Sequence, residues 1–410
     1  MDNAAVLQRD LLHWFEQHKR DLPWRGLARD GARDPYRVWL AEVMLQQTQV
    51  ATVIPFFVRW LDRFPTLAEF AAAPLDDVLK QWEGLGYYSR ARNFHRAAQQ
   101  VQADFAGEIP NTVEGLLALP GIGRYTAGAI ASLAFGLDAP ILDGNVKRIW
   151  ARLFALTETN NEALWAISHN LLPQGRAGEF NEALMDLGAT VCTPRSPSCP
   201  DCPLCWHCQA YAQGKPDQFP VKVKKPATPH KDIGTLVVLN AHGQALMGQR
   251  PTQGLLGGLW EFVSDEIGVS VRPALPLLVE GDVALNQIAM QVLHRLNLPI
   301  VLGEVSTLGT VKHSFTHFKI TRHVVLSYVN GRAENITAPT PFYQQLKWVA
   351  QDEINTLALT RSDQKIVSLV VKQVWRNQEN WVLSSKTKNV IPTSDSEEES
   401  LRRKPREMPR

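Results

Sequence analysis

The stretch LPGIGRYTAG, residues 119–128, is a glycine hairpin that opens directly into a helix of small residues. Glycine lets the backbone approach a neighbouring surface closely, and the free N–H groups at the start of a helix can hold a phosphate. The stretch therefore predicts a phosphate-binding turn at Gly121 and Gly123. A tight connection between two helices has the same signature, so the hairpin needs a second motif beside it.

About 20 residues further on, LDGNVK places Asp143 at the start of the next helix. An aspartate at this position is typical of a helix N-cap. Because it also follows the glycine hairpin closely in sequence, we expect its carboxylate to belong to the same site. The pattern leaves the structural and the chemical interpretation of Asp143 open.

Upstream of the hairpin, Glu42 interrupts the apolar helical stretch WLAEVMLQQT, residues 39–48. We expect Trp39, Val43 and Gln46 to share its helical face and to bury it partly, which would raise its pKa toward that of a general acid. A buried ion pair is the alternative. Cleavage of a glycosidic bond through a cationic sugar needs two carboxylates in different environments, and Glu42 and Asp143 suit the acid and the stabilising anion.

Downstream of the hairpin, all five cysteines lie on one short loop, at positions 192, 199, 202, 205 and 208. Four thiolates on one loop can ligate a single metal centre, and an iron–sulfur cluster suits this compressed spacing better than zinc, which usually takes two separated knuckles. Cys199, Cys202 and Cys205 form the C-x2-C-x2-C run of ferredoxins, whereas Cys192, Cys199, Cys202 and Cys208 form an alternative set. The spacing alone does not identify the spare thiol.

The composition predicts several domains and a local nucleic-acid surface. A chain of 410 residues with 45% hydrophobic content exceeds one small core, and Lys+Arg 43 against Asp+Glu 41 gives a net charge of only +2. Neither an apolar run of membrane-spanning length nor a signal peptide is seen. These patterns favour a soluble intracellular protein that does not bind membranes.

Hydrophobic periodicity divides the chain into a helical part and an α+β part. Helix starts are predicted at Asp34-Pro35, before a run to Val50, and at the capping box Thr66 to Glu69. Strands are expected at 234–240, 245–249 and 319–329, and helices at 283–296 and 362–374. The predicted boundaries are a helical domain 1–191, a cysteine loop 192–213, a linker 214–230, an α+β domain 231–378 and a disordered tail 379–410.

The hairpin, the LDGNVKR motif, the EVMLQQTQV helix and the cysteine loop together resemble the endonuclease III superfamily of helix-hairpin-helix iron–sulfur DNA glycosylases. Within that superfamily, the chain is similar to the adenine DNA glycosylases, the MutY family, over about residues 8–375. The resemblance implies a monomeric enzyme of the bacterial cytoplasm and nucleoid. It also implies a [4Fe-4S] cluster, a Nudix-like C-terminal domain, and removal of adenine opposite 8-oxoguanine or guanine in double-stranded DNA, leaving an abasic site.

The resemblance also assigns roles to residues in the helical part. Glu42 would protonate adenine N7, Asp143 would stabilise the sugar cation, and Tyr125 and Asn145 would support that step. The positions that would line the extruded adenine are Trp24, Arg25 and Glu182. The wedge that enters the base stack would be Gln47 and Tyr87. The cluster ligands would be Cys192, Cys199, Cys202 and Cys208, which makes Cys205 the spare.

In the C-terminal part, Phe315, Thr316 and His317 resemble the loop that reads 8-oxoguanine, where the family typically has Phe-Ser-His. Thr316 keeps the hydroxyl group and adds a methyl group. The stretch GGLWE, residues 257–261, resembles the start of a Nudix box, but the glutamate-rich helix that would bind magnesium does not follow it. The resemblance therefore implies a reader of DNA rather than a nucleotide hydrolase.

Three other functions fit parts of the pattern. A bifunctional glycosylase and lyase acting on oxidised pyrimidines would need a lysine where this chain has Tyr125, although Lys147 lies close to Asp143 in sequence. A non-catalytic lesion-binding protein would not need both Glu42 and Asp143. A Nudix pyrophosphatase would need the missing part of the box.

Overall fold

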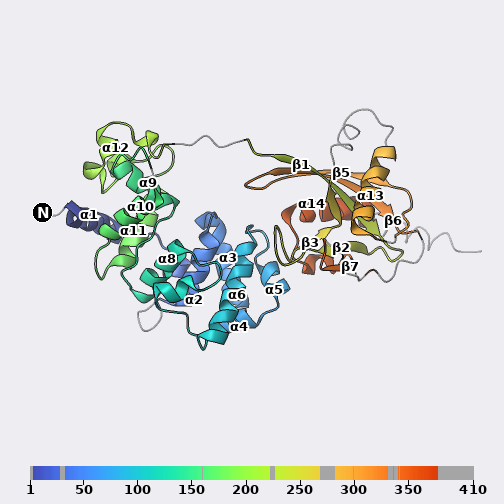
Figure 1. Ribbon diagram of the computed structural model, residues 1–410, viewed down its shortest axis with the longest axis horizontal. Coiled ribbons are helices and arrows are strands. Elements are labelled where there is room, and N and C mark those ends of the chain that lie inside the picture. Colours follow the sequence, from blue (N-terminus) through green and yellow to red (C-terminus); the bar gives the residue numbers. More distant parts are fainter. Residues whose placement is uncertain are drawn as a thin grey trace, which may run out of the picture.

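The computed structural model describes residues 3–27, 33–158, 160–221, 227–267, 282–298, 300–330, 336, 340 and 342–376. A helical part and a part built on a β-sheet lie side by side along the longest axis (Figure 1). Across the described ranges, no helix is both long enough and apolar enough to cross a membrane. The tail predicted at 379–410 lies outside the described residues.

The helical part contains the elements from the N-terminus to the cysteine loop. Its helices are α1 Asn3–His18, η1 Pro23–Arg25, α2 Pro35–Leu45, α3 Val50–Arg63, α4 Leu67–Ala72, α5 Leu75–Gln81, α6 Ser89–Asp104, α7 Val113–Leu117, α8 Arg124–Phe135, α9 Gly144–Leu153, α10 Asn161–Asn170 and α11 Ala177–Thr190. The cysteine loop and the segment after it add η2 Cys199–Asp201, η3 Cys205–His207, α12 Gln209–Ala212 and η4 Pro216–Gln218.

The predicted helix starts are confirmed, with one difference. Asp34 caps α2 by accepting hydrogen bonds from two backbone N–H groups, and Thr66 and Glu69 form a capping box at α4. The run predicted to reach Val50 instead breaks after Leu45, and a new helix begins at Val50. The break contains Gln47 in the left-handed region, with φ 56°. Propensity alone did not reveal this turn, because the residues around it are ordinary helix formers.

Two apolar clusters fill the helical part. One gathers the aromatic residues of α2, α3 and α6, including Trp39, Trp60 and Phe94, and the other packs α1 against α9 and α11. Helix α8 contributes Ala127 to the first cluster and Ala129 to the second. The helix of small residues predicted from the hairpin therefore lies between the two clusters, where close packing is needed.

The C-terminal part is a mixed sheet with helices on both sides. Its elements are β1 His230–Leu239, β2 Ala245–Gln249, β3 Trp260–Phe262, β4 Ser264–Glu266, α13 Asp282–Leu296, β5 Ser306–Ser314, β6 Lys319–Tyr328, β7 Gln345–Val349, η6 Ile354–Thr356, α14 Arg361–Val370 and the π-helical turn η7 Val371–Trp375. The strand order is β3-β2-β1-β6-β5, with β4 on β1 and β7 on β2. Strands β1 and β6 are parallel, and the other pairs are antiparallel.

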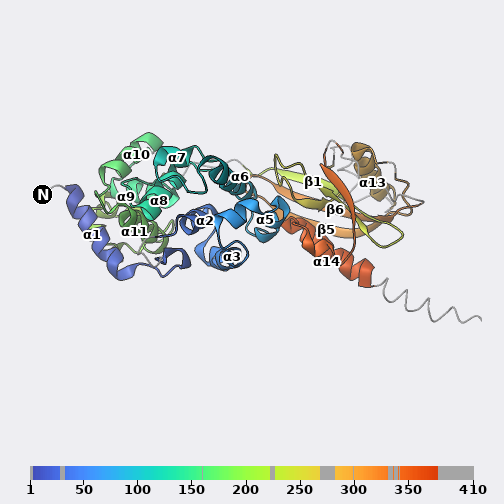
Figure 2. The ribbon, with the colours of Figure 1, turned by 90° about the horizontal axis from the view of Figure 1, so that it is seen from below.

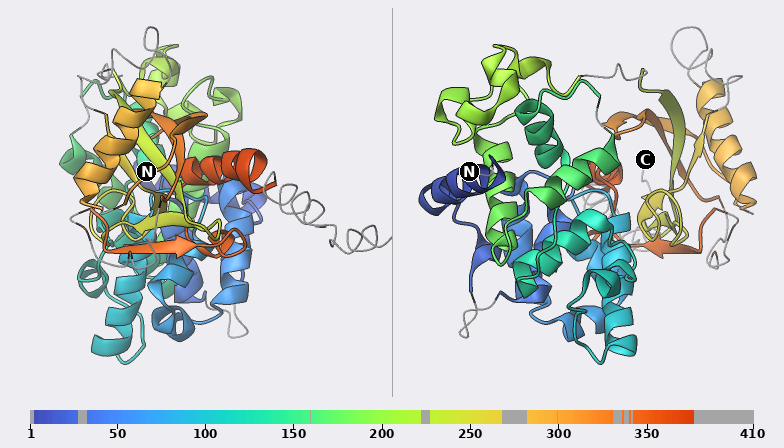
Figure 3. Two further views of the ribbon diagram at one scale, coloured as in Figure 1. Left: turned by 90° about the vertical axis from the view of Figure 1, so that its right-hand side faces the viewer. Right: turned by 60° about the vertical axis from the view of Figure 1, so that its left-hand side comes forward.

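Alternate residues of β1 point to opposite faces of the sheet, as a strand requires. Val237 and Leu239 join the apolar cluster under α14, whereas Leu236 and Val238 join the cluster under α13. Figures 2 and 3 show these two helices on opposite sides of the strands. Burial on both faces explains why β1 reads as a continuous apolar run.

The two parts share a packed interface. Leu259 and Ala358 of the C-terminal part belong to the apolar cluster around α2 and α6. Polar contacts surround them: Gln249 Nε2 donates to Asp76 Oδ1 over 2.8 Å, and the Leu359 backbone N–H donates to Glu83 Oε1 over 2.8 Å. These contacts hold the sheet part next to the helices of the other part.

Candidate active site

Glu42 lies on α2 with 4% of its surface exposed. The Tyr125 hydroxyl donates a hydrogen bond of 2.8 Å to Glu42 Oε2. Burial raises the pKa of Glu42 to about 7, and the nearby Asp143 and Glu182 carboxylates add to that rise. Among the described residues, Arg25 and Arg33 form ion pairs with Glu182, and none is found with Glu42.

Glu42 lies on a different side of α2 from the one that the sequence predicted. Glu42 faces a cavity with Val38 and Leu45, four residues before and three residues after it. Trp39, Val43 and Gln46 line a different cavity. On a helix, the residues three and four positions away from a given residue are both its neighbours. Spacing alone therefore could not decide which side of α2 Glu42 faces. The predicted shared face of Trp39, Val43 and Gln46 with Glu42 was therefore wrong.

Asp143 is the N-cap of α9, as one interpretation of its position predicted. Its carboxylate accepts hydrogen bonds from the Val146 N–H over 2.7 Å and from Asn145 Nδ2 over 3.0 Å. Burial raises the pKa of Asp143, and these hydrogen bonds oppose that rise. The cap also fixes the direction of the carboxylate, so a structural role and a chemical role are compatible here.

Asn145 connects Asp143 to the cysteine loop through Arg148. The Arg148 guanidinium donates to Asn145 Oδ1 over 2.8 Å and, through Nε, to the Cys192 carbonyl over 2.7 Å. It also donates to the Gly188 carbonyl over 2.7 Å. A Cβ at Gly188 would lie 2.6 Å from the Cβ of Asn145, so glycine permits this approach of α11 to α9. Sequence reasoning missed Arg148, which forms part of the LDGNVKR motif.

Helix α8 sets the position of Tyr125 against Asp143. Gly128 of α8 packs closely against the backbone of the segment that precedes Asp143. A side chain at Gly128 would clash with the carbonyl oxygen of Pro140. Tyr125 is half-buried, and burial of its hydroxyl raises its pKa well above the ordinary value. The hydroxyl therefore stays protonated at neutral pH and acts as a donor to Glu42.

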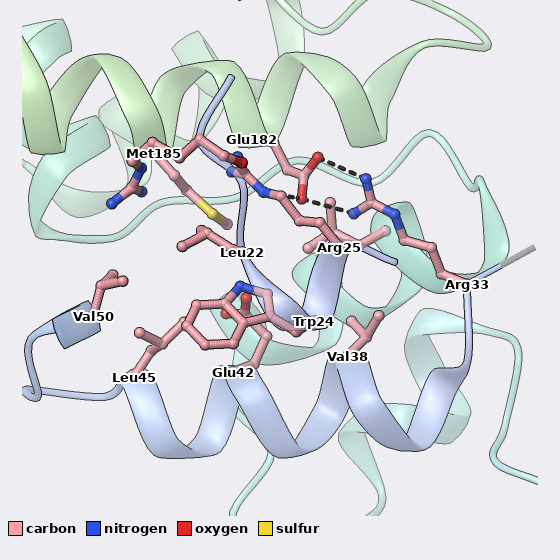
Figure 4. A pocket seen from close by; sticks show the side chains of 12 residues that line it. Leu22, Trp24, Arg25, Arg33, Val38, Glu42, Leu45, Val50, Glu182 and Met185 are labelled. Carbon is pink, nitrogen blue, oxygen red and sulfur yellow. Dashed lines mark hydrogen bonds and ion pairs between the residues drawn. The ribbon is translucent and has the colours of Figure 1, made fainter. Parts of the chain in front are cut away.

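Beside Glu42 lies a cavity lined by Trp24, Arg25 and Glu182, the three residues expected around an extruded base. Figure 4 shows Arg25 and Arg33 turned toward Glu182 from two sides. Arg25 Nε donates to Glu182 over 2.9 Å, and Arg33 donates to both carboxylate oxygens over 2.7 and 2.8 Å. The cavity measures about 40 Å³, room for a few water molecules and not for a purine.

Arg33 is a pocket residue that sequence reasoning missed, because its part of the chain carries no recognisable pattern. Its neighbours Arg20 and Asp186 were missed too. Arg25 donates to Asp186 through both terminal nitrogens, and Arg20 Nε donates to Asp186 over 2.8 Å. These bonds order the guanidinium groups around the cavity.

The turn that was predicted to bind phosphate is a tight glycine turn before α8. Gly121 has φ 80° and leaves no space for a Cβ, which would lie 2.6 Å from the Cβ of Asn93. Gly123 is the N-cap of α8, and both glycines are exposed. The first N–H groups of α8 therefore face outward from an exposed turn, where a phosphate could reach them.

The two predicted wedge residues are exposed at the tips of separate turns. Gln47 follows α2 and Tyr87 precedes α6, and both have left-handed backbones, with φ 56° and 48°. The Tyr87 hydroxyl lies 2.5 Å from the Thr316 hydroxyl of the C-terminal part. The structure therefore brings the wedge of one part and the predicted reading loop of the other together.

The reading loop connects β5 to β6. Phe315 stacks on Phe318 with ring centroids 4.6 Å apart, while Thr316 and His317 are exposed. In the truncated Nudix box, Glu261 is buried and accepts hydrogen bonds from Arg250 and the Tyr343 hydroxyl, each over 2.8 Å. Helix α13 contains no glutamate.

The cysteine loop follows the end of α11. Cys192, Cys202 and Cys208 pack against the second apolar cluster, and Arg152 donates to Cys192 Sγ over 3.3 Å. Burial raises the pKa of Cys202 to about 12, and neighbouring thiolates reinforce that rise. Over the described residues, no three Cys, His, Asp or Glu side chains converge as ligands of one metal ion.

Comparison with known proteins identifies both parts of the chain. The HhH-GPD superfamily of base excision DNA repair proteins matches residues 40–173, and a NUDIX domain matches residues 234–369. The adenine DNA glycosylase of Homo sapiens is 35% identical over 418 residues, covering 88% of this chain and 73% of that protein. The Mus musculus enzyme is 35% identical over 455 residues, covering 97% and 84%.

Among solved structures, a thermostable thymine-DNA glycosylase matches 51% of this chain and 97% of its own, at 30% identity and a TM-score of 0.47. The two matched families fall on the helical part and on the sheet part. The fold expected from the sequence, a helix-hairpin-helix glycosylase domain followed by a Nudix-like α+β domain, is therefore confirmed.

Proposed function

The chain belongs to the adenine DNA glycosylase family and is a DNA glycosylase that acts on adenine, and we propose that it excises adenine opposite 8-oxoguanine or guanine in double-stranded DNA. Its product would be an abasic site. The observation that carries the proposal is Glu42, a buried carboxyl group with a pKa of about 7 that lies beside the cavity.

Two carboxyl groups divide the chemistry. Because burial raises the pKa of Glu42 to about 7, this carboxyl group can carry a proton near neutral pH, as a general acid for adenine N7 must. Asp143, held by Asn145 and the Val146 N–H, would stabilise the positive charge that develops on the sugar. Tyr125 would keep Glu42 oriented through its hydroxyl group.

The base cavity supports adenine as the extruded base. Glu182 Oε2 accepts one hydrogen bond and retains a lone pair for the exocyclic amine of adenine. Arg25 and Trp24 would complete the pocket, with Arg33 moving aside. Extrusion costs a few kcal/mol, and Gln47 and Tyr87 would offset it by entering the stack.

A monofunctional reaction fits the residues at the site. A lyase needs an amine near the sugar, and Tyr125 occupies the position where a lysine would stand. The Lys147 amine instead donates to Asn161 Oδ1 over 2.8 Å. We therefore expect hydrolysis without efficient strand cleavage.

Cys192, Cys199, Cys202 and Cys208 would hold a [4Fe-4S] cluster, and Cys205 would be the spare. The cluster would supply a structural anchor for the loop after α11, which Arg148 ties to Asn145. Cys205→Ser should retain about four irons per chain, whereas Cys199→Ser should lose them, measured by iron analysis and visible absorbance. A colourless protein with one zinc ion would exclude the cluster, and the reverse pair of results would show that Cys205 is a ligand.

The protein would contact DNA through the α7–α8 turn at Gly121 and Gly123, the wedge residues, and the loop Phe315, Thr316 and His317. We propose that it acts as a monomer on the nucleoid of a bacterial cell.

The direct test uses duplexes that carry adenine opposite 8-oxoguanine, guanine or thymine. Excision, scored as strand breaks after alkali, should be fastest opposite 8-oxoguanine and slowest opposite thymine. Equal excision rates opposite all three bases would contradict the proposed specificity for the mispair. Efficient nicking without alkali, or excision of oxidised pyrimidines in parallel duplexes, would favour the bifunctional alternative.

A further inference from the structure

We propose that Arg90 is a positioning residue that holds both wedge turns of the DNA-binding surface in register with one guanidinium group. The inference rests on the proposed function, because it takes Gln47 and Tyr87 to enter the base stack. It assigns a role to a residue that lies away from the cavity beside Glu42.

Arg90 lies near the start of α6 with only 9% of its surface exposed. Its Nη1 donates to three carbonyl groups at the end of α2, those of Val43 over 2.8 Å, Met44 over 2.8 Å and Gln46 over 2.6 Å. Its Nη2 contacts the Thr48 hydroxyl over 3.3 Å and the carbonyls of Leu85 over 3.4 Å and Gly86 over 3.2 Å. One side chain thus spans two turns that lie about 40 residues apart in sequence.

The contacts surround the two wedge residues. Gln47 stands between the Gln46 carbonyl and the Thr48 hydroxyl, and Tyr87 directly follows the Gly86 carbonyl. Both wedge residues have left-handed backbones, which persist in residues other than glycine only where the surroundings fix them. The Tyr87 ring also lies 5.4 Å from the Arg90 guanidinium. The group that contacts both turns therefore provides that fixation.

Arginine suits this position for two physical reasons. A cation is favourable at the C-terminal end of α2, where the carbonyl groups lack partners within the helix. Burial lowers the pKa of Arg90 to about 10, so the group stays charged at neutral pH. A lysine would keep the charge but not the planar fork that contacts both turns.

The consequence is a wedge that is arranged before DNA binds. If Gln47 and Tyr87 enter the stack at a fixed separation, losing Arg90 should slow extrusion of the base more than cleavage of its bond. A merely structural role would slow both steps alike. This difference separates a positioning role from a general packing role.

The test compares two substrates and three variants of the full-length protein. R90K and R90Q should cut single-turnover excision from the adenine:8-oxoguanine duplex by roughly 10- to 100-fold. With adenine opposite an abasic site, where stacking is already weakened, the loss should stay within a few-fold. R63Q removes an exposed arginine that pairs with Asp77 and serves as the charge-matched control, with rates near wild type.

Extrusion can also be observed directly. With 2-aminopurine in place of the target base, binding of the wild-type protein should increase the 2-aminopurine fluorescence. With R90K, this increase should be slower. The double variant R90K/Y87A should lose little beyond Y87A alone, since both changes disable the same wedge. The inference would be overturned if the rate losses of R90K and Y87A multiplied in the double variant. It would also be overturned if R90K excised adenine at the wild-type rate, or if it lost the same factor in rate on both substrates.

Two further outcomes are distinguishable. A wild-type protein that leaves adenine:8-oxoguanine uncut contradicts the proposed function rather than the role of Arg90. If neither R90K nor R90Q folds, hydrogen exchange of wild type decides. The Thr48 and Leu85 amides, which close the two turns, should then exchange as slowly as the core of α2, and rapid exchange in either turn would overturn the inference.

Discussion

The proposed acid site and the proposed lesion-reading loop hold their polar groups in different ways. Glu42 and Asp143 are enclosed within the helical part, where Tyr125 and Asn145 bond to them before any DNA is present. Thr316 is exposed, and the hydrogen bond of its hydroxyl crosses to the other part. The difference suggests that bond cleavage is preorganised, whereas lesion reading is assembled from two parts. Variants should therefore separate rate from discrimination.

The largest effect is expected at Glu42. Glu42→Gln keeps the shape of the side chain but cannot release a proton to N7, so single-turnover excision should fall by about 10²–10⁴-fold. Gel-shift affinity for the adenine:8-oxoguanine duplex should stay near wild type, because the change removes no phosphate contact. Excision within a few-fold of wild type would mean that another group is the acid.

Asp143→Asn should have the next largest effect. It removes the charge that faces the developing sugar cation, which is worth about 3 kcal/mol and corresponds to roughly 10²–10³-fold in rate. The asparagine oxygen can still accept from the Val146 N–H, so the melting temperature should change little. A variant that loses stability but not rate would reduce Asp143 to a helix cap.

The pH dependence of the excision rate should reflect the titration of both Glu42 and Asp143. Because Glu42 must be protonated and its pKa is raised to about 7, the rate should fall about tenfold per pH unit above 7. Asp143 must be ionised, and its raised pKa means that the rate also declines toward acid pH. Single-turnover profiles should thus be bell-shaped, and the alkaline limb should disappear in Glu42→Gln. An alkaline limb that persists in this variant would assign it to a different group.

The smallest effect is expected in the reading loop. Thr316→Val removes the hydroxyl that meets Tyr87, a hydrogen bond worth about 0.5–1.5 kcal/mol. Preference for 8-oxoguanine over guanine should fall a few-fold while the cleavage rate opposite guanine stays constant. Thr310→Val on the same hairpin is the matched control. If discrimination survives in Thr316→Val, lesion reading does not depend on the contact between the two parts.

The sequence predicted those local features well that depend on the physical properties of a single residue type and its near neighbours in the chain. The Asp34 cap, the close approach of the Gly121 backbone to Asn93 and the span of β2 follow from such rules. It failed where the answer depended on packing between distant segments. The side of α2 that Glu42 faces depends on how α2 packs against its neighbours. The role of Arg33 depends on Glu182, which lies 149 positions away.

The contribution of Leu259 and Ala358 to the apolar cluster of the helical part has a consequence during synthesis. The last helical-part residue of that cluster is Ala139, so the ribosome must add about 220 further residues before the cluster is complete. At 5–20 residues per second this takes roughly 10–40 s. During that interval the residues of the helical part that pack against Leu259 and Ala358 lack these apolar partners.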